Sequence, residues 1–304
     1  MGKPVTAVEL AGVKLQNPVM PASGTFAYGM EYKDLYDLHV LGAVTTKSVT
    51  AEPRYGNPLP RIAECPSGMM NSIGLQNPGI EHFIAEDLPL LTSEYHGPLV
   101  VNISGFSVEE YAELAGRLDA IPEIDILEIN ISCPNVQHGG AAFGTDPKMA
   151  EKITEEVRRR TTKPIFMKLT PNITDITEIA RACESGGADG ISMINNFKAM
   201  RIDLRSRRTI TSVPYAGLSG PAIRPIAQRM VNEVFHAVKL PIIGIGGIRT
   251  ADDVLEMIMA GATAIQMGSA NLVDPWAMPK VIEALPERME YYGIKDLKEI
   301  RGVV

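Results

Sequence analysis

The feature that most constrains the fold is an eightfold alternation of short apolar segments with longer segments of helical period. Near-continuous apolar strands that alternate with helices indicate a parallel sheet whose outer face is covered. Eight such units in 304 residues favour a closed (β/α)8 TIM barrel over an open doubly wound sheet. The expected strands are Pro18–Pro21, Ala43–Thr46, Leu99–Ile103, Ile126–Ile131, Ile165–Leu169, Gly190–Ile194, Ile242–Ile245 and Ala264–Met267.

Capping patterns support the intervening helices. Ser107, followed three residues later by Glu110, has the spacing of a capping box. Asp146-Pro147 places proline at a first helical position, where its missing N–H costs nothing. Thr250 is expected to begin another helix, and Gly261 to end it.

Neither a linker nor a low-complexity segment divides the chain, so we expect residues 1–304 to form one domain. Near its start, Val8–Leu10 and Val13–Leu15 flank Ala11-Gly12 and predict a small hairpin that closes the bottom of the barrel. Two long segments, Val49–Leu90 and Asn196–Ser219, exceed the usual βα loop. Because long loops at the carboxyl ends of barrel strands build active sites, we expect the chemistry there.

The composition excludes several classes of protein. A net charge of -7 argues against a nucleic-acid binder, which normally carries a basic stripe. The three cysteines, Cys65, Cys133 and Cys183, fit neither a disulfide framework nor a structural zinc site. No apolar run approaches the roughly 18 residues of a membrane helix, and residues 1–10 lack the apolar core of a signal peptide. We therefore expect a cytoplasmic protein without a metal or a membrane anchor.

Polar residues and glycines gather at the carboxyl ends of the expected strands. A purely structural barrel needs no such ring, because buried amides and ammonium groups are costly unless they meet partners. The alternative is that these side chains only satisfy loop backbones. The residues are Ser23-Gly24, Lys47-Ser48, Asn102, Asn130, Lys168, Asn195-Asn196, Gly246-Gly247 and Gly268-Ser269.

The late glycines predict a phosphate site. Gly246-Gly247 follows the seventh strand, and Gly268-Ser269 follows the eighth. Barrels commonly bind phosphate there, because glycine lets backbone N–H groups approach the oxygens. Tight turns are the alternative reading. No G-x-G-x-x-G follows an early strand, so we predict no Rossmann nicotinamide site.

Cys133 is the candidate base. It lies just beyond the fourth strand in Asn130-Ile131-Ser132-Cys133-Pro134-Asn135. Its thiolate could remove a proton, since a free thiol titrates near about 8.5. We interpret Cys65 and Cys183 as small hydrophobic residues. His138 either assists Cys133 or is a solvated loop residue.

Two lysines at the ends of expected strands each have more than one possible role. Lys168, at the end of the fifth strand, requires an anion, and a reduced flavin ring would suit it. It could instead form a Schiff base, as in a barrel aldolase. Lys47 could bind a carboxylate or the flavin. The segment Met69–Leu75 could offer backbone N–H groups to a small anionic substrate.

Several longer motifs follow one another along nearly the whole chain. They are Asn17–Gly24, Pro53–Pro58, Asn71–Gly79, Asn130–Asn135, His138–Gly140, Phe143–Pro147, Gly217–Ala222 and Gly268–Asn271. With these motifs in this order, the chain resembles the class 1 dihydroorotate dehydrogenases, and among them the B-type catalytic subunits. A cysteine after the fourth strand is typical of class 1, whereas class 2 uses serine.

The resemblance implies FMN-dependent oxidation of dihydroorotate to orotate in pyrimidine (UMP) biosynthesis. Cys133 would take a proton from C5 while C6 gives hydride to flavin N5. FMN would contact Ser23, Lys47, Ser48, Asn102, Asn130, Lys168, Ile194, Gly220, Gly246, Gly247, Gly268 and Ser269. Dihydroorotate would contact Lys47, Asn71, Ser72, Ile73, Gly74, Leu75, Asn130, Asn195 and Asn196.

The resemblance also implies a partner. Electrons would reach NAD through a second subunit that carries FAD and a [2Fe–2S] cluster, in a heterotetramer of two catalytic chains and two such partners. Two positions depart from the family pattern: Asn196 stands where threonine is usual, and Ala199 where glycine is common. We expect retained substrate binding with altered affinity.

Three other functions compete with this one. The first is an FMN barrel that acts on another dihydropyrimidine, which only a substrate test separates. The second is a Schiff-base lyase that uses Lys168, which borohydride trapping would reveal. The third is a non-catalytic flavin-binding or scaffold subunit, for which Cys133 would be dispensable.

Overall fold

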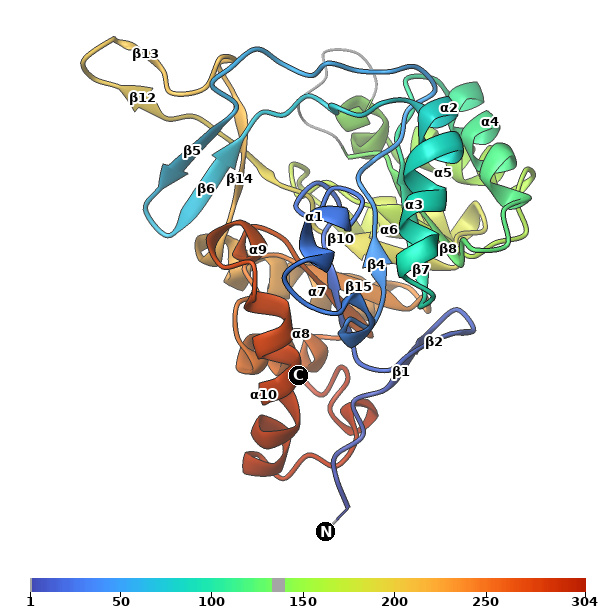
Figure 1. Ribbon diagram of the computed structural model, residues 1–304, viewed down its shortest axis with the longest axis vertical. Helices are drawn as coiled ribbons and strands as arrows, with labels where there is room; N and C mark the ends of the chain where they lie inside the picture. Colours follow the sequence, from blue (N-terminus) through green and yellow to red (C-terminus); the bar gives the residue numbers. More distant parts are fainter. Residues whose placement is uncertain (1, 133–139) are drawn as a thin grey trace.

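The centre of the molecule is a sheet of eight parallel strands in the order β3-β16-β15-β10-β9-β8-β7-β4. The computed structural model describes residues 2–132 and 140–304 (Figure 1). Each strand lies within a segment predicted from the sequence. The strands are β3 (Val19–Pro21), β4 (Val44–Thr45), β7 (Leu99–Ile103), β8 (Ile126–Asn130), β9 (Ile165–Lys168), β10 (Gly190–Met193), β15 (Ile242–Ile245) and β16 (Ala264–Met267).

The two end strands of this order, β3 and β4, bring the sheet close to a closed ring. The N–H of Gly42, just before β4, donates a hydrogen bond of 2.9 Å to the carbonyl of Val19 in β3. The backbones approach so closely that a Cβ at Gly42 would lie 2.1 Å from the carbonyl oxygen of Asn17. The predicted (β/α)8 barrel is therefore confirmed, and glycine is required at the closure.

Helices cover the strands in chain order, with α4, α5, α6, α7 and α8 each contacting the next, and α10 contacting α8 and β3. The helices are α1 (Met30–Lys33), α2 (Ile80–His82), α3 (Leu88–Glu94), α4 (Val108–Asp119), α5 (Pro147–Arg158), α6 (Ile176–Ser185), α7 (Arg224–Ala237), α8 (Ala251–Met259), α9 (Ala270–Val273) and α10 (Ala277–Tyr291). In the described parts of the chain, none of these helices combines the length and apolar character needed to cross a membrane.

The predicted caps are present. The Ser107 hydroxyl accepts from the N–H of Glu110 at 3.1 Å, and the Asp146 carboxylate accepts from Lys148 N at 3.0 Å ahead of Pro147. Thr250 begins α8 with a complete capping box. Such caps each stabilise a helix by about 1 kcal/mol.

Gly116 in α4 offers a test of the helix layer. A Cβ there would make only ordinary contacts, at 3.6 Å from Arg160 Cβ. We expect Gly116→Ala to raise the free energy of unfolding by about 0.5–1 kcal/mol, because alanine loses less backbone entropy in a helix. Urea denaturation measures this. At Gly261, with a φ of +124°, a Cβ would lie 2.4 Å from Phe235 Cγ, so Gly261→Ala should destabilise the protein. A Gly116→Ala variant less stable than the parent would contradict the assigned helix packing.

The two long segments that the sequence left without structure form a second, antiparallel sheet. Its order is β11-β14-β6-β5, and a hairpin of β12 and β13 projects beside it (Figure 1). The strands are β5 (Ile62–Cys65), β6 (Gly68–Asn71), β11 (Phe197–Ala199), β12 (Ile202–Asp203), β13 (Arg208–Thr209) and β14 (Ala216–Ser219). We call the β11-β14-β6-β5 sheet the outer sheet.

The predicted N-terminal hairpin is confirmed as β1 (Val8–Leu10) and β2 (Val13–Leu15), which pair antiparallel. Ala11 and Gly12 turn the chain with φ angles of 48° and 89°. Both values lie in the left-handed region that tight two-residue hairpin turns require.

Candidate active site

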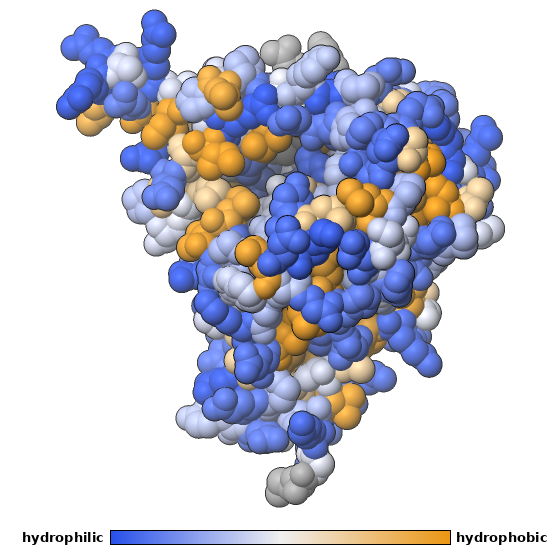
Figure 2. Space-filling model, in the orientation of Figure 1, coloured by the Kyte–Doolittle hydropathy of each residue, from blue (hydrophilic) through white to orange (hydrophobic). Residues whose placement is uncertain are grey.

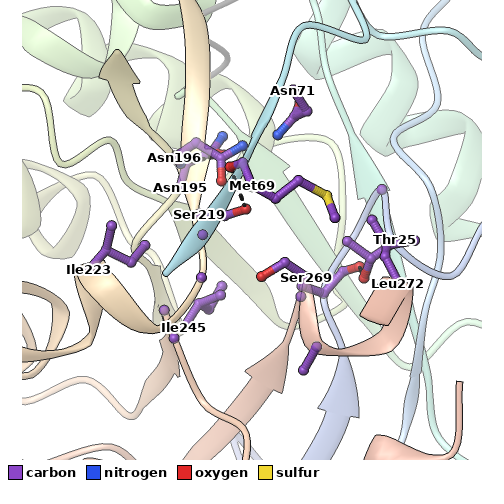
Figure 3. A pocket seen from close by; sticks show the side chains of 18 of the residues that line it. Thr25, Met69, Asn71, Asn195, Asn196, Ser219, Ile223, Ile245, Ser269 and Leu272 are labelled. Carbon is purple, nitrogen blue, oxygen red and sulfur yellow. Dashed lines mark hydrogen bonds between the residues drawn. The ribbon is translucent and has the colours of Figure 1, made fainter. Parts of the chain in front are cut away.

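A cavity of about 430 Å³ lies at the carboxyl ends of the barrel strands, beneath the outer sheet (Figure 3). This volume falls in the usual range of small-molecule sites. Residues beyond β3, β4, β10, β15 and β16 line it from the barrel, and β5, β6 and β14 line it from the outer sheet. Apolar side chains gather around the hollow below the projecting hairpin (Figure 2). The cavity is therefore where the sequence predicted the chemistry.

The glycine turns after β15 and β16 form one side of the cavity. Gly246 and Gly247 have φ angles of +136° and +72°, and a Cβ on either would come within 2.7 Å of a neighbouring side chain in α7. The backbone N–H groups of Gly247, Ile248 and Ser269 have no hydrogen-bond partner among the described residues. Unpaired N–H groups on glycine turns suit phosphate oxygens.

Gly268 differs from these two glycines because its backbone is unstrained. A Cβ at Gly268 would meet nothing closer than the Cβ of Ala22, at 3.7 Å. Since Gly268 lines the cavity, a larger side chain there would occupy space that a ligand can use. Nearby, the buried hydroxyl of Ser23 has no partner among the described residues. An unpaired polar atom beside open space also fits a polar ligand.

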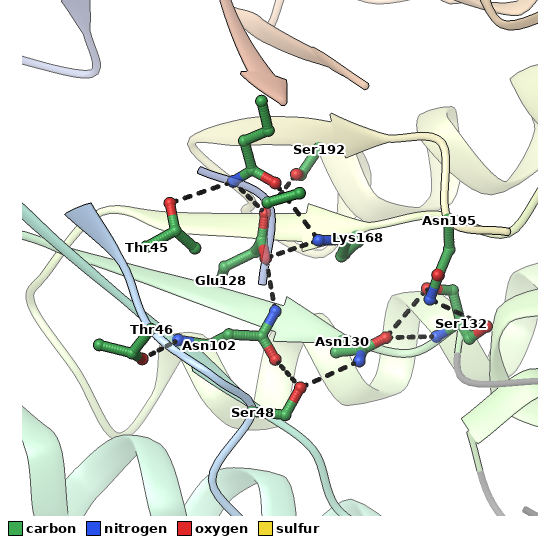
Figure 4. A network of polar contacts seen from close by, with 12 residues as sticks. Thr45, Thr46, Ser48, Asn102, Glu128, Asn130, Ser132, Lys168, Ser192 and Asn195 are labelled. Carbon is green, nitrogen blue, oxygen red and sulfur yellow. Dashed lines mark hydrogen bonds and ion pairs between the residues drawn. The ribbon is translucent and has the colours of Figure 1, made fainter. Parts of the chain in front are cut away.

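Directly beneath the cavity, Glu128 lies at the centre of a buried polar network (Figure 4). Its Oε1 accepts from Ser192 Oγ and, at 2.9 Å, from Gln266 Nε2. Its Oε2 accepts from Asn102 Nδ2 and, at 3.0 Å, from Lys168 Nζ. Two carboxylate oxygens have about four acceptor positions, so this carboxylate is fully satisfied.

The network continues from Asn102 to the cavity wall (Figure 4). Ser48 Oγ donates to Asn102 Oδ1, and Asn130 Nδ2 donates to Ser48 Oγ at 3.4 Å. Ser132 Oγ donates to Asn130 Oδ1, and Asn195 Nδ2 donates to Ser132 Oγ, both at 2.9 Å. Continuous hydrogen bonding fixes the orientation of amide groups. Asn130 and Asn195 therefore reach the cavity already oriented.

The electrostatics of this network centre on the Glu128–Lys168 ion pair. Burial acts to raise the pKa of Glu128, but the charge of Lys168 and hydrogen bonds from Ser192, Lys168 and Asn102 bring that pKa below its usual value. The carboxylate is therefore ionised. The Lys168 ammonium has three N–H groups and two partners among the described residues, Glu128 Oε2 and Gln266 Oε1 at 3.3 Å. Because Lys168 lines the cavity, its remaining N–H can serve a ligand.

The structure brings most of the predicted flavin-site residues to this one cavity. Asn102 is the exception, since it is fully buried below the cavity and supports Ser48. Those that line the cavity are Ser23, Lys47, Ser48, Asn130, Lys168, Ile194, Gly220, Gly246, Gly247, Gly268 and Ser269.

The predicted substrate residues divide in the same way. Ser72 and Gly74 lie behind the cavity wall. The Ser72 hydroxyl is buried and has no partner within residues 2–132 and 140–304, and Gly74, with a φ of +78°, packs against Asn57. Those that line the cavity are Lys47, Asn71, Ile73, Leu75, Asn130, Asn195 and Asn196.

The three cysteines have different outcomes. Cys133, the predicted base, and His138 lie outside the described residues. Cys183 is buried in α6, where burial raises the pKa of its thiol to about 12, as expected of an inert core residue. Cys65 ends β5 and lies on the cavity wall, a position that the sequence did not indicate.

Sequence reasoning missed Glu128, Ser192 and Gln266. The signal was present: Glu128 is the one charged residue in the apolar segment Ile126–Ile131. A charge on a strand that is buried on both faces requires a buried partner. Lys168 on the next strand was the available cation.

Comparison with known proteins identifies the family. A family model described as dihydroorotate dehydrogenase matches residues 5–289. The chain belongs to the dihydroorotate dehydrogenase family. Relatives that match this chain over nearly their whole length carry the name dihydroorotate dehydrogenase B (NAD(+)), catalytic subunit.

The relative from Geotalea uraniireducens is 53% identical over 304 residues, covering 100% of this chain and 99% of its own. The relative from Listeria monocytogenes is 50% identical over 295 residues, covering 97% of both chains. The relative from Enterococcus faecalis is 50% identical over 300 residues, covering 99% of this chain and 96% of its own. The resemblance to dihydroorotate dehydrogenases inferred from the motifs is thereby confirmed.

Proposed function

We propose that this chain is the catalytic subunit of an NAD-linked dihydroorotate dehydrogenase, which oxidises dihydroorotate to orotate with FMN in pyrimidine biosynthesis. One observation carries the proposal. A single cavity unites glycine turns suited to phosphate, a lysine suited to an anionic ring, and amides suited to a pyrimidine. The names of the full-length relatives agree with this chemistry.

The residues present fit FMN. Gly246-Gly247 and Gly268-Ser269 would hold its phosphate, because their backbones leave N–H groups and open space at the cavity. The Ser23 hydroxyl, which has no partner in the described parts of the chain, and the Lys168 ammonium would bind polar atoms elsewhere on the cofactor. When bound, FMN supplies an acceptor for hydride from C6 of dihydroorotate.

The oriented amides account for substrate binding. Asn130 and Asn195 are fixed by Ser48 and Ser132, so they can pair with the ring amides of dihydroorotate without further ordering. Orientation of this kind supplies much of the catalytic advantage of an enzyme. Lys47 would bind the substrate carboxylate, and Asn71 would add an amide from the outer sheet (Figure 3).

The proposed base is Cys133, which would remove the proton from C5. This assignment is carried over from the family resemblance, on the Asn130–Asn135 motif. Deprotonation at C5 together with hydride loss at C6 creates the C5–C6 double bond of orotate. The two hydrogens leave as one proton and one hydride, so two electrons pass from the substrate to the flavin in each turnover.

Electron delivery to NAD requires a partner subunit. A [2Fe–2S] cluster is usually held by four cysteines, whereas this chain has three in total, widely spaced. We therefore propose that FAD and the cluster belong to a second subunit, in an assembly of two catalytic chains and two partners. The name "catalytic subunit" of the relatives supports a multi-subunit enzyme.

An anaerobic absorbance spectrum tests the proposal. Purified protein should be yellow, and its oxidised-flavin band should bleach when dihydroorotate is added, because two electrons enter the flavin. Dihydrouracil is the matched control and should leave the band unchanged. If dihydrouracil bleached the flavin band and dihydroorotate did not, the substrate would be another dihydropyrimidine. A protein without flavin affinity would overturn it.

The Schiff-base alternative is disfavoured by the structure. A Schiff base requires a neutral lysine amine, whereas Lys168 is ion-paired with the ionised Glu128 at 3.0 Å. Borohydride should therefore trap no carbonyl compound on Lys168.

A further inference from the structure

The Glu128–Lys168 pair has a property that the proposed reaction does not explain. The Glu128 side chain is completely buried, and the Lys168 side chain is 6% exposed. Burying an ion pair costs several kcal/mol per ion, and apolar residues of similar volume often replace such pairs without loss. Stability alone therefore gives little reason for a carboxylate inside this barrel.

The hydrogen-bond partners of Glu128 indicate that its carboxylate fixes the position of Lys168. They come from four different strands: Asn102 from β7, Lys168 from β9, Ser192 from β10 and Gln266 from β16. Gln266 Oε1 also accepts from Lys168, so the ammonium is held from two sides. Lys168 consequently has one position, with its remaining N–H available to the cavity.

We propose that Glu128 is a positioning residue, whose buried negative charge keeps Lys168 protonated and fixed at the wall of the flavin cavity, whether the flavin is oxidised or reduced. The inference rests on the proposed function, since it requires FMN in the cavity. Lys168 then presents a constant positive charge to the flavin, and reduction of the flavin takes up no proton at Lys168.

The other charged groups do not replace Glu128 in this role. Among the described residues, the titratable groups that line the cavity are Lys47, Glu64, Cys65, Lys168 and Arg249. Lys47 and Arg249 are cations and would disfavour the charge on Lys168. Glu64 is in β5 of the outer sheet, whereas the groups hydrogen-bonded to Lys168 lie in the barrel strands β8 and β16.

The decisive variant is Glu128→Gln, which keeps the shape and removes the charge. A buried lysine without a carboxylate partner loses its proton readily. In Glu128→Gln, Lys168 should therefore be neutral while the flavin is oxidised. It should regain a proton when reduction adds negative charge to the flavin. The number of protons taken up per two electrons should therefore rise by about one. The slope of the flavin midpoint potential against pH, from about pH 6 to 10, measures this number.

Two further variants isolate the cause. Ser192→Ala removes one hydrogen bond to Glu128 but leaves its charge, so it should keep the parental slope. The double variant Glu128→Gln/Lys168→Met lacks the coupled group and should also return to the parental slope. A steeper slope that persists in the double variant would place the coupling elsewhere and overturn the proposal.

The remaining outcomes are also decisive. If Glu128→Gln binds FMN and keeps the parental slope, Glu128 serves only packing and the inference is wrong. If the parent protein binds no FMN, the proposed function itself fails. Should Glu128→Gln fold poorly or lose FMN, nitrogen-15 NMR of the parent holoprotein decides, with the Lys168 signal assigned by Lys168→Met. A charged ammonium through about pH 9 in both redox states supports the inference, and a neutral amine overturns it.

Discussion

Replacement of Cys133 by alanine is expected to lower the turnover of dihydroorotate by about 10²–10⁴-fold, the usual effect of removing a general base. Alanine keeps the small size of the side chain and removes only the thiol that we propose takes the C5 proton. FMN should remain bound, because the residues proposed to hold its phosphate, Gly246-Gly247 and Gly268-Ser269, follow other strands of the barrel. Anaerobic stopped-flow measurement of flavin bleaching by dihydroorotate reports this step directly.

Cys183→Ala is the matched control for loss of a thiol. Cys183 is buried in α6 and has no place in the cavity, so its replacement should leave the bleaching rate near that of the parent. A Cys133→Ala protein that bleaches at the parental rate would show that another group removes the proton. It would also favour the non-catalytic alternative, for which Cys133 is dispensable.

Gly268→Leu is expected to give a folded protein that does not retain FMN. The backbone at Gly268 has no left-handed φ, and a Cβ meets only Ala22, at 3.7 Å, so leucine adds little strain. Its side chain would instead fill the part of the cavity next to Ser269 that we assign to the phosphate. Flavin absorbance relative to protein absorbance should fall to near zero, while the far-ultraviolet circular dichroism stays that of the parent.

A graded series separates this effect from general damage. Gly268→Ala adds only the Cβ and should weaken flavin binding less than leucine does. Gly247→Ala should instead impair folding, because a Cβ at this positive φ would lie 2.7 Å from Arg224 Cβ. If Gly268→Leu binds FMN as the parent does, the phosphate lies elsewhere and the glycines serve only as tight turns.

The barrel could be predicted from the sequence because its signal is local. Each inner strand is a short apolar segment bounded by turn residues, and eight of them recur in order. Some strands are shorter than the sequence predicted. In β4, only Val44–Thr45 of the predicted Ala43–Thr46 forms a strand. The outer sheet gave no comparable signal, since β6 pairs with β14 across a long stretch of chain, for example Asn71 with Gly217.

The candidate site was predicted in part, and for different reasons. Strand-end residues such as Asn130 and Lys168 could be found because the barrel brings all strand ends to one face. Asn102 is buried and does not line the cavity, so its predicted contact with the flavin stays a prediction. The Glu128–Lys168 pair was missed because partners on neighbouring strands are not neighbours in sequence. Cys133 as the base stays a prediction.

The outer sheet also determines when the cavity can exist during synthesis of the chain. Its two halves, β5–β6 and β11–β14, leave the ribosome far apart in time, and β6 has no β14 to pair with until residues 216–219 have emerged. Gly268-Ser269 emerges later still, after β16. Since translation proceeds from the N-terminus, a nascent chain lacks a complete wall until Gly268-Ser269 has been made. Any ligand of this cavity can therefore meet its complete wall only after residue 269 has emerged.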